Sequence, residues 1–284
     1  MYHLEVGRIN KGHRHGPPFD LISIELCRGL LAFTALFALI APDVGAETIT
    51  QAQYRNPVHR YGHFALGQPH EYSRLVVTTD TGQSLELRLP EVEVFEDFEP
   101  RLVRLMPGEP EEILSIVSSS ESGSRLVLIK INDGRLRISA QSRPIGTPMR
   151  WLNPVAVTDL DGDGRAEIAA VITPHIGGTL KIYRRAGSDL VEIAALAGFS
   201  NHVYGSPELR LSSPVLIAGR MHLLVPDTTR RYLRIIAFTG DSLMEMGRCE
   251  LRQPVTGPVQ VMPSSEITVG YRAGQQLIAL NDCL

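Results

Sequence analysis

The sequence predicts an all-β protein, arranged as a single β-propeller of about five four-stranded blades. Two observations predict this fold: glycine turns that recur at a nearly constant spacing, and short apolar segments placed alike around each turn. Gly82, Gly134, Gly187 and Gly240 are separated by 52, 53 and 53 residues. Repeating units of roughly 50 residues, each with room for four short strands, are typical of propeller blades.

Four segments in each repeat are expected to form its strands. One alternating apolar segment follows each glycine, one more continuous segment precedes it, another lies before that, and a fourth opens the repeat after a proline. The segments before the glycines are 75–77, 126–129, 180–183 and 233–236; those before them are 113–117, 168–172 and 223–225; the opening prolines are Pro100, Pro154, Pro214 and Pro258. The 19 prolines and 25 glycines act as turn punctuation between the strands.

The last repeat is incomplete, because the chain ends after three expected strands at 258–261, 267–271 and 276–280. We expect its outer strand to come from 48–53, so that the two ends of the chain close the ring. Closure of this kind removes an open sheet edge that would otherwise pair with other chains. Six blades are the alternative if 54–71 holds more strand than its sequence indicates.

The first 46 residues have the pattern of a secretory signal peptide. Arg28 precedes a 13-residue run, 29–41, that is apolar apart from Thr34, and the small residues of Val44-Gly45-Ala46 suit a signal peptidase. The run is short for a membrane span. We therefore predict a signal peptide over 1–46, a β-propeller domain over 47–284, and a periplasmic or extracellular location.

Charge and cysteine content narrow the function of the mature domain. The formal charge of the whole chain is −3, and 1–46 holds equal numbers of acidic and basic residues, so the mature charge is also −3. This charge does not suit nucleic acid, and no membrane span remains after cleavage; a protein or a glycan is the expected partner.

Cys249 and Cys283 form a possible disulfide in an oxidising compartment, with two buried free thiols as the alternative.

One short segment, 159–167, carries the pattern of a cation-binding loop. Asp159, Asp161 and Asp163 alternate with other residues, and Glu167 stands at the ninth position. Calcium is held by six to eight oxygens from carboxylates, carbonyls and water. We predict that the three aspartates and Glu167 supply carboxylate oxygens and that Arg165 supplies its backbone carbonyl. An EF-hand is excluded, because its twelfth position would be Ala170, and the apolar flanks predict a β-hairpin rather than two helices.

The segment 157–168, Val-Thr-Asp-Leu-Asp-Gly-Asp-Gly-Arg-Ala-Glu-Ile, resembles the core of an FG-GAP, or VCBS-type, repeat. Such repeats form the calcium-loop blades of integrin-α-like β-propellers and of many secreted bacterial proteins. The resemblance implies a propeller fold and a structural calcium ion. The family usually has Asp at the ninth loop position, where this chain has Glu167, and the motif occurs in one of the expected repeats.

Catalytic patterns are weak elsewhere in the chain. The histidines of the mature domain lack zinc-ligand spacing and are expected to be solvent-exposed or hydrogen-bonded. The acids at 91–99 are expected to lie in a solvated loop, and Trp151 is expected to act as a wedge between blades. The sequence therefore predicts a secreted, non-catalytic binding or scaffold propeller. A lectin-like carbohydrate-binding propeller is the alternative, followed by a glycoside hydrolase.

Overall fold

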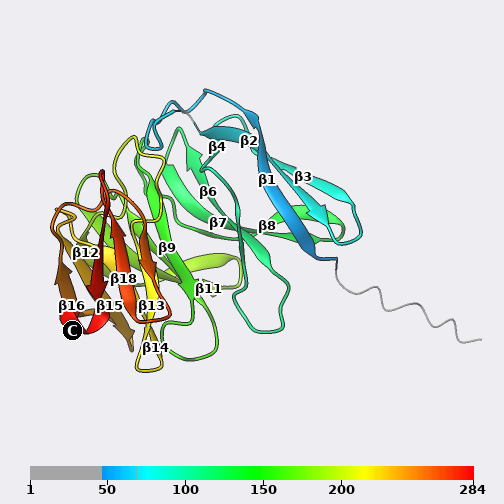
Figure 1. Ribbon diagram of the computed structural model, residues 1–284. Helices are drawn as coiled ribbons and strands as arrows, with labels where there is room; N and C mark the ends of the chain where they lie inside the picture. Colours follow the sequence, from blue (N-terminus) through cyan, green and yellow to red (C-terminus); the bar gives the residue numbers. More distant parts are fainter. Residues whose placement is uncertain (1–46, 69) are drawn as a thin grey trace, which may run out of the picture. The chain divides into compact units, whose positions relative to one another are not determined.

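The computed structural model describes residues 47–68 and 70–284 (Figure 1). The predicted signal peptide, 1–46, lies outside the described residues. The described part is all-β, and the strands fall into five consecutive units. Among the described residues, no helix is long and apolar enough to cross a membrane.

Each unit consists of short antiparallel strands that follow one another in the chain. Unit 1 contains β1 (Ile49–Pro57), β2 (Glu71–Thr79) and β3 (Ser84–Arg88); unit 2 contains β5 (Arg101–Val103), β6 (Glu112–Ser119), β7 (Gly123–Asn132) and β8 (Arg135–Ser142). Unit 3 contains β9 (Leu152–Thr158), β10 (Glu167–Ile172), β11 (Gly178–Ala186) and β12 (Asp189–Phe199). Unit 4 contains β13 (Ser213–Ile217), β14 (Arg220–Pro226), β15 (Tyr232–Thr239) and β16 (Ser242–Glu250). Unit 5 contains β17 (Val259–Val261), β18 (Glu266–Gly270) and β19 (Gln275–Ala279), and ends in a 3-10 helix, η1 (Leu280–Cys283). The strand segments predicted within units 2 to 5 all overlap these strands, although 258, 271 and 280 fall outside β17, β18 and β19.

Strand pairing joins the first three units into one twelve-stranded sheet. The short strand β4 (Glu93–Glu96) pairs with both β2 and β6, and so connects units 1 and 2. A two-residue parallel pairing of β12 with β8 connects units 2 and 3. Units 4 and 5 form separate sheets of four and three strands.

The hydrophobic core is divided among the spaces between consecutive units. In a strand, successive side chains point to opposite faces, and in the middle units both faces are apolar. On β6, for example, Ile113 and Val117 belong to the cluster shared with unit 1, whereas Leu114 and Ile116 belong to the cluster shared with unit 3. Equivalent clusters lie between units 3 and 4 and between units 4 and 5. Each unit is therefore held by face-to-face packing against its neighbours in the chain.

The prediction that 48–53 completes the last unit is wrong. Residues 49–53 belong to β1, which pairs antiparallel with β2 over seven partner positions from Ile49↔Thr79 to Pro57↔Tyr72. The long alternating surface of β2 offers this strand a nearby partner, and unit 5 keeps three strands. In the described part of the chain, strand pairing does not close the units into a ring. Residues 58–68 and His70 form no strand, so the strand-rich segment on which a sixth unit would depend is missing there.

Candidate functional site: an acidic loop and a histidine pocket

The acidic loop is the hairpin that joins β9 to β10, as the apolar flanks predict. Gly162 and Gly164 have φ angles of 83° and 86°, which residues with a Cβ rarely adopt. Their backbone N–H groups donate to the two carboxylate oxygens of Asp159, at 2.7 and 2.9 Å. The loop therefore curls around Asp159.

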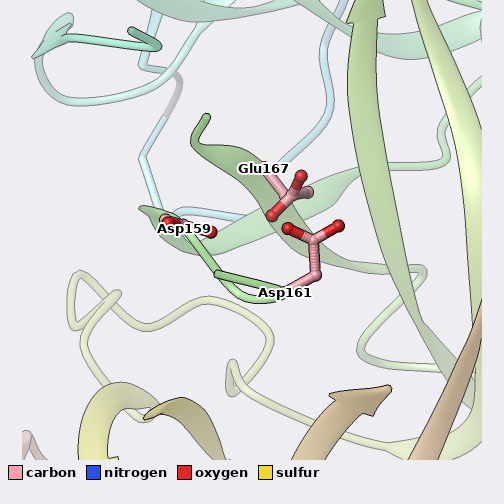
Figure 2. A group of neighbouring side chains, drawn as sticks. All are labelled: Asp159, Asp161 and Glu167. Carbon is pink, nitrogen blue, oxygen red and sulfur yellow. The ribbon is translucent and has the colours of Figure 1, made fainter. Parts of the chain in front are cut away.

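Three of the predicted ligands converge. Asp159, Asp161 and Glu167 each place a carboxylate oxygen within 4.8 Å of the others. Figure 2 shows these side chains, with the carboxylates of Asp161 and Glu167 turned toward one another. Asp159 and Asp161 are half-buried, whereas Glu167 is fully buried and accepts a hydrogen bond from the Leu160 N–H at 3.0 Å. An all-oxygen donor set of this kind suits a hard divalent cation.

The other two predicted ligands lie at the exposed tip of the hairpin. Asp163 is exposed, and its Oδ1 accepts a hydrogen bond from the Arg165 N–H at 2.8 Å. Asp163 is not in the converging group of carboxylates, and the backbone carbonyl of Arg165 stays a predicted ligand. The carboxylates that converge come from the first half of the loop and from the start of β10.

A neighbouring cation, Arg184, is a part of this site that the sequence analysis missed. Its guanidinium donates to Glu167 Oε1 at 3.0 and 2.8 Å and to Asp161 Oδ2 at 2.5 Å. Burial raises the pKa of Glu167, while the Glu167 carboxylate raises the pKa of Arg184. The strand register was the available signal: Ile168 pairs with Tyr183 on β11, which places Arg184 opposite Glu167.

A second cluster of polar side chains surrounds a small pocket with a volume of about 90 Å³. Its lining comes from the β1–β2 connection of unit 1, the β10–β11 turn of unit 3, and the connections that enter and leave unit 3. The lining residues are His63, Met149, Arg150, Trp151, Thr173, His175, Ile176 and Tyr204. Trp151 is buried between units 2 and 3, as expected of a wedge, and its indole N–H donates to the Glu96 carbonyl at 3.1 Å.

The histidines of this pocket are tied to buried partners. His63 Nδ1 lies 2.7 Å from Glu96 Oε1, and the Glu96 side chain is 1% exposed. His175 Nε2 lies 2.7 Å from His202 Nδ1, and His202 Nε2 lies 2.9 Å from the Ser206 carbonyl oxygen. Burial lowers the pKa of His175 to about 3 and that of His202 to about 4, so both imidazoles are neutral near pH 7.

The expectation that the acids of 91–99 form a solvated loop is wrong for two of them. Glu96 ends strand β4 and Asp97 follows it, and both are buried. Arg101 forms an ion pair with Asp97, while Ser118 and His63 contact the Glu96 carboxyl. The apolar pair Val94-Phe95, buried on β4 beside Glu96, was the available signal of a buried strand.

No family model matches this chain, and no curated protein matches it.

Proposed function

We propose that this chain is a secreted, non-catalytic binding or scaffold protein in which the β9–β10 loop binds calcium as a structural ion. The observation that carries the proposal is the convergence of Asp159, Asp161 and Glu167 on one hairpin, with their oxygens within 4.8 Å of one another. A bound cation would link the loop to the start of β10, and it would compensate the charge that Arg184 leaves unpaired. The protein partner or glycan then binds elsewhere on a rigid scaffold.

We further propose that the five units are the blades of a β-propeller of the FG-GAP or VCBS type, with a fifth blade of three strands. The face-to-face cores between consecutive units support this arrangement. A crystal structure in which unit 5 packs against unit 1 would agree with the proposal. An open stack with unit 5 free on its outer face would contradict it.

Thermal unfolding with and without calcium tests the metal site. A ligand that binds only the folded state stabilises it by about 2.7 kcal/mol at a hundredfold excess over its Kd. Extracellular calcium modules have Kd values of about 10⁻⁴–10⁻³ M, so we expect a higher Tm in about 10 mM calcium than in chelator, lost in Asp161→Asn. The exposed Asp241, in the β15–β16 turn, gives the matched control Asp241→Asn, which should keep the full response.

The variant Arg184→Gln distinguishes a calcium site from a permanent ion pair between Arg184 and the carboxylates of the loop. If calcium binds, it competes with the guanidinium for Asp161 and Glu167, so Arg184→Gln should bind calcium more tightly by isothermal titration. If Arg184 is the permanent counter-ion, Arg184→Gln simply loses stability and gains no calcium response. That result, together with a wild-type Tm unaffected by calcium, would overturn the proposed structural ion.

Secretion and the lack of catalysis have their own tests. The proposal expects periplasmic or culture-medium protein whose N-terminal sequence begins at Glu47, as cleavage after Ala46 requires. An intact N-terminus on cytoplasmic protein would contradict it. A panel of chromogenic glycosides and esters in millimolar calcium should show no turnover above that of heat-denatured protein.

A further inference from the structure

Exposed apolar side chains gather around the mouth of the histidine pocket. Met149, Ile176 and Tyr204 line the pocket and are 42%, 60% and 55% exposed, and Phe64, next to His63 in the chain, is 48% exposed. Segments far apart in sequence are held together here, since the Gly205 N–H donates to the Ala65 carbonyl at 2.9 Å. Apolar surface around a polar hollow is typical of a binding site.

Hydrogen bonding fixes where the proton lies on the histidine pair. The Ser206 carbonyl oxygen only accepts, so His202 Nε2 must carry the proton in their 2.9 Å contact. Neutral His202 then has an unprotonated Nδ1, which accepts the Nε2–H of His175 at 2.7 Å. Because burial keeps His175 neutral, its Nδ1 is left as a hydrogen-bond acceptor.

His63 is oriented by its contact with a buried carboxyl group. Ser118 Oγ donates to Glu96 Oε2 and also lies 2.6 Å from Ser124 Oγ. His63 Nδ1 lies 2.7 Å from Glu96 Oε1, which accepts the imidazole proton. With that proton on Nδ1, the Nε2 of a neutral imidazole is a hydrogen-bond acceptor.

Both acceptor nitrogens are open to the pocket. Within residues 47–68 and 70–284, neither His63 Nε2 nor His175 Nδ1 has a hydrogen-bond partner, and neither is among the buried side-chain atoms that lack one. Charges of both signs lie nearby: Arg150 lines the pocket, Arg230 lowers the pKa of both His175 and His202, and Glu208 raises that of His202. The arginines oppose a cation, and the two lone pairs oppose an anion, so a neutral hydrogen-bond donor fits best.

Backbone strain marks the same place. Met149 and Thr173 line the pocket with φ angles of 55° and 52°, a region that is strained for a β-branched residue such as threonine. The Met149 N–H donates to the Tyr61 hydroxyl at 2.8 Å, and the Thr173 N–H donates to the Trp151 carbonyl at 2.9 Å. Strained residues held in place in this way cluster at binding and catalytic sites.

We propose that the histidine pocket binds a neutral sugar, with two neighbouring hydroxyl groups donating to His63 Nε2 and His175 Nδ1 and the C–H face of the ring lying on Tyr204. About 90 Å³ is the volume of roughly three water molecules. This space holds two hydroxyls and their carbons, and leaves the rest of the ring on the apolar rim. The inference names a ligand for the binding function proposed above, and it rests on that function.

Isothermal titration of the purified secreted protein against single sugars tests the site. The probes are the methyl glycosides of glucose, galactose, mannose and fucose, with glucosamine and sialic acid as cationic and anionic comparisons. We expect at least one neutral glycoside to bind with millimolar Kd and both charged sugars to bind more weakly. A deoxy analogue that lacks one of the two hydroxyls should lose about tenfold in affinity.

Variants decide whether binding occurs in this pocket. His175→Phe and His63→Phe keep an aromatic ring but remove the acceptor, and each should weaken binding tenfold or more, as should Tyr204→Ala. His222→Phe, on β14 and outside the pocket, is the matched control and should bind like the wild type. Far-UV circular dichroism checks that each variant is folded; if His175→Phe is unfolded, Tyr204→Ala and the deoxy analogue carry the test.

Three results would overturn the sugar site: no binding of any neutral glycoside, equal or tighter binding of a charged sugar, or binding unaffected in the folded pocket variants. The calcium response of the Tm is measured on the same samples. Failure of sugar binding with an intact calcium response leaves the cation-stabilised scaffold standing. Sugar binding without a calcium response overturns the structural ion and keeps the pocket.

Discussion

At the scale of single residues, the buried histidine pair should make stability depend on pH. The pKa values of His202 and His175 are lowered from 6.5 to about 4 and about 3. Below about pH 6.5 the two histidines therefore bind protons in the unfolded chain but not in the folded chain, and the free energy of unfolding falls as the pH drops. Between pH 6 and 5 the free energy of unfolding should decrease by up to about 1.4 kcal/mol per pH unit for each histidine.

Urea denaturation of the wild type and of the His175→Gln/His202→Gln double variant at pH 7, 6 and 5 measures this slope. The groups that face the pair are His63, Arg230, Glu208 and the Ser206 carbonyl, and all of them remain in the variant. The double variant should lose stability less steeply on acidification. Equal slopes for the two proteins would show that the histidines are not held neutral.

Residue partners across strands were the least predictable part of the site. The spacing of the carboxylates in 159–167 predicted four converging acids, and three of them, Asp159, Asp161 and Glu167, converge, because neighbours in a tight hairpin are set by local geometry. Arg184 and the burial of Glu96 were missed, since each depends on the strand that happens to lie alongside. Glu96 is buried because β4 is placed between β2 and β6, a pairing that no local pattern specifies.

At the scale of elements, the end of the chain docks closely on β16. Gly247 allows this approach, because a Cβ at this position would lie 2.1 Å from the Cys283 carbonyl oxygen. We expect Gly247→Ala to lower the free energy of unfolding by about 1–3 kcal/mol, the usual cost of overpacking. Ser242→Ala, an exposed position on the same strand, should change it little. Guanidinium denaturation of the two variants gives the comparison, and equal stabilities would contradict close docking of η1.

Strand positions were predictable, whereas one strand's partner was not. The alternating segment after Gly240 lies within β16, and the continuous segment 233–236 lies within β15. Period-2 alternation and glycine turns are local features, so they place a strand along the chain. Which strand pairs with 48–53 is a long-range question. The register with β2 buries Tyr54 in the cluster of units 1 and 2, an outcome that depends on the packed core.

At the scale of the whole molecule, the described units depend on packing between neighbours, and the last unit packs against unit 4. A disulfide between Cys249 on β16 and Cys283 in η1 links its end to unit 4, across 34 residues of sequence. Closing a loop of this length in the unfolded chain stabilises a protein by about 3–4 kcal/mol in the chain-entropy model. Both cysteines are buried in the core between units 4 and 5.

We therefore expect the Cys249→Ser/Cys283→Ser variant to unfold at lower denaturant concentration than the wild type, with a loss of about 3–4 kcal/mol. A reducing agent should bring the wild type down to the level of the variant and leave the variant unchanged. Thiol labelling with mass spectrometry of secreted protein reads the bond directly. Two labelled thiols in the native protein would contradict the pairing. In that case units 4 and 5 would depend on their shared apolar core alone, and unit 5 should be the first to exchange its amide hydrogens.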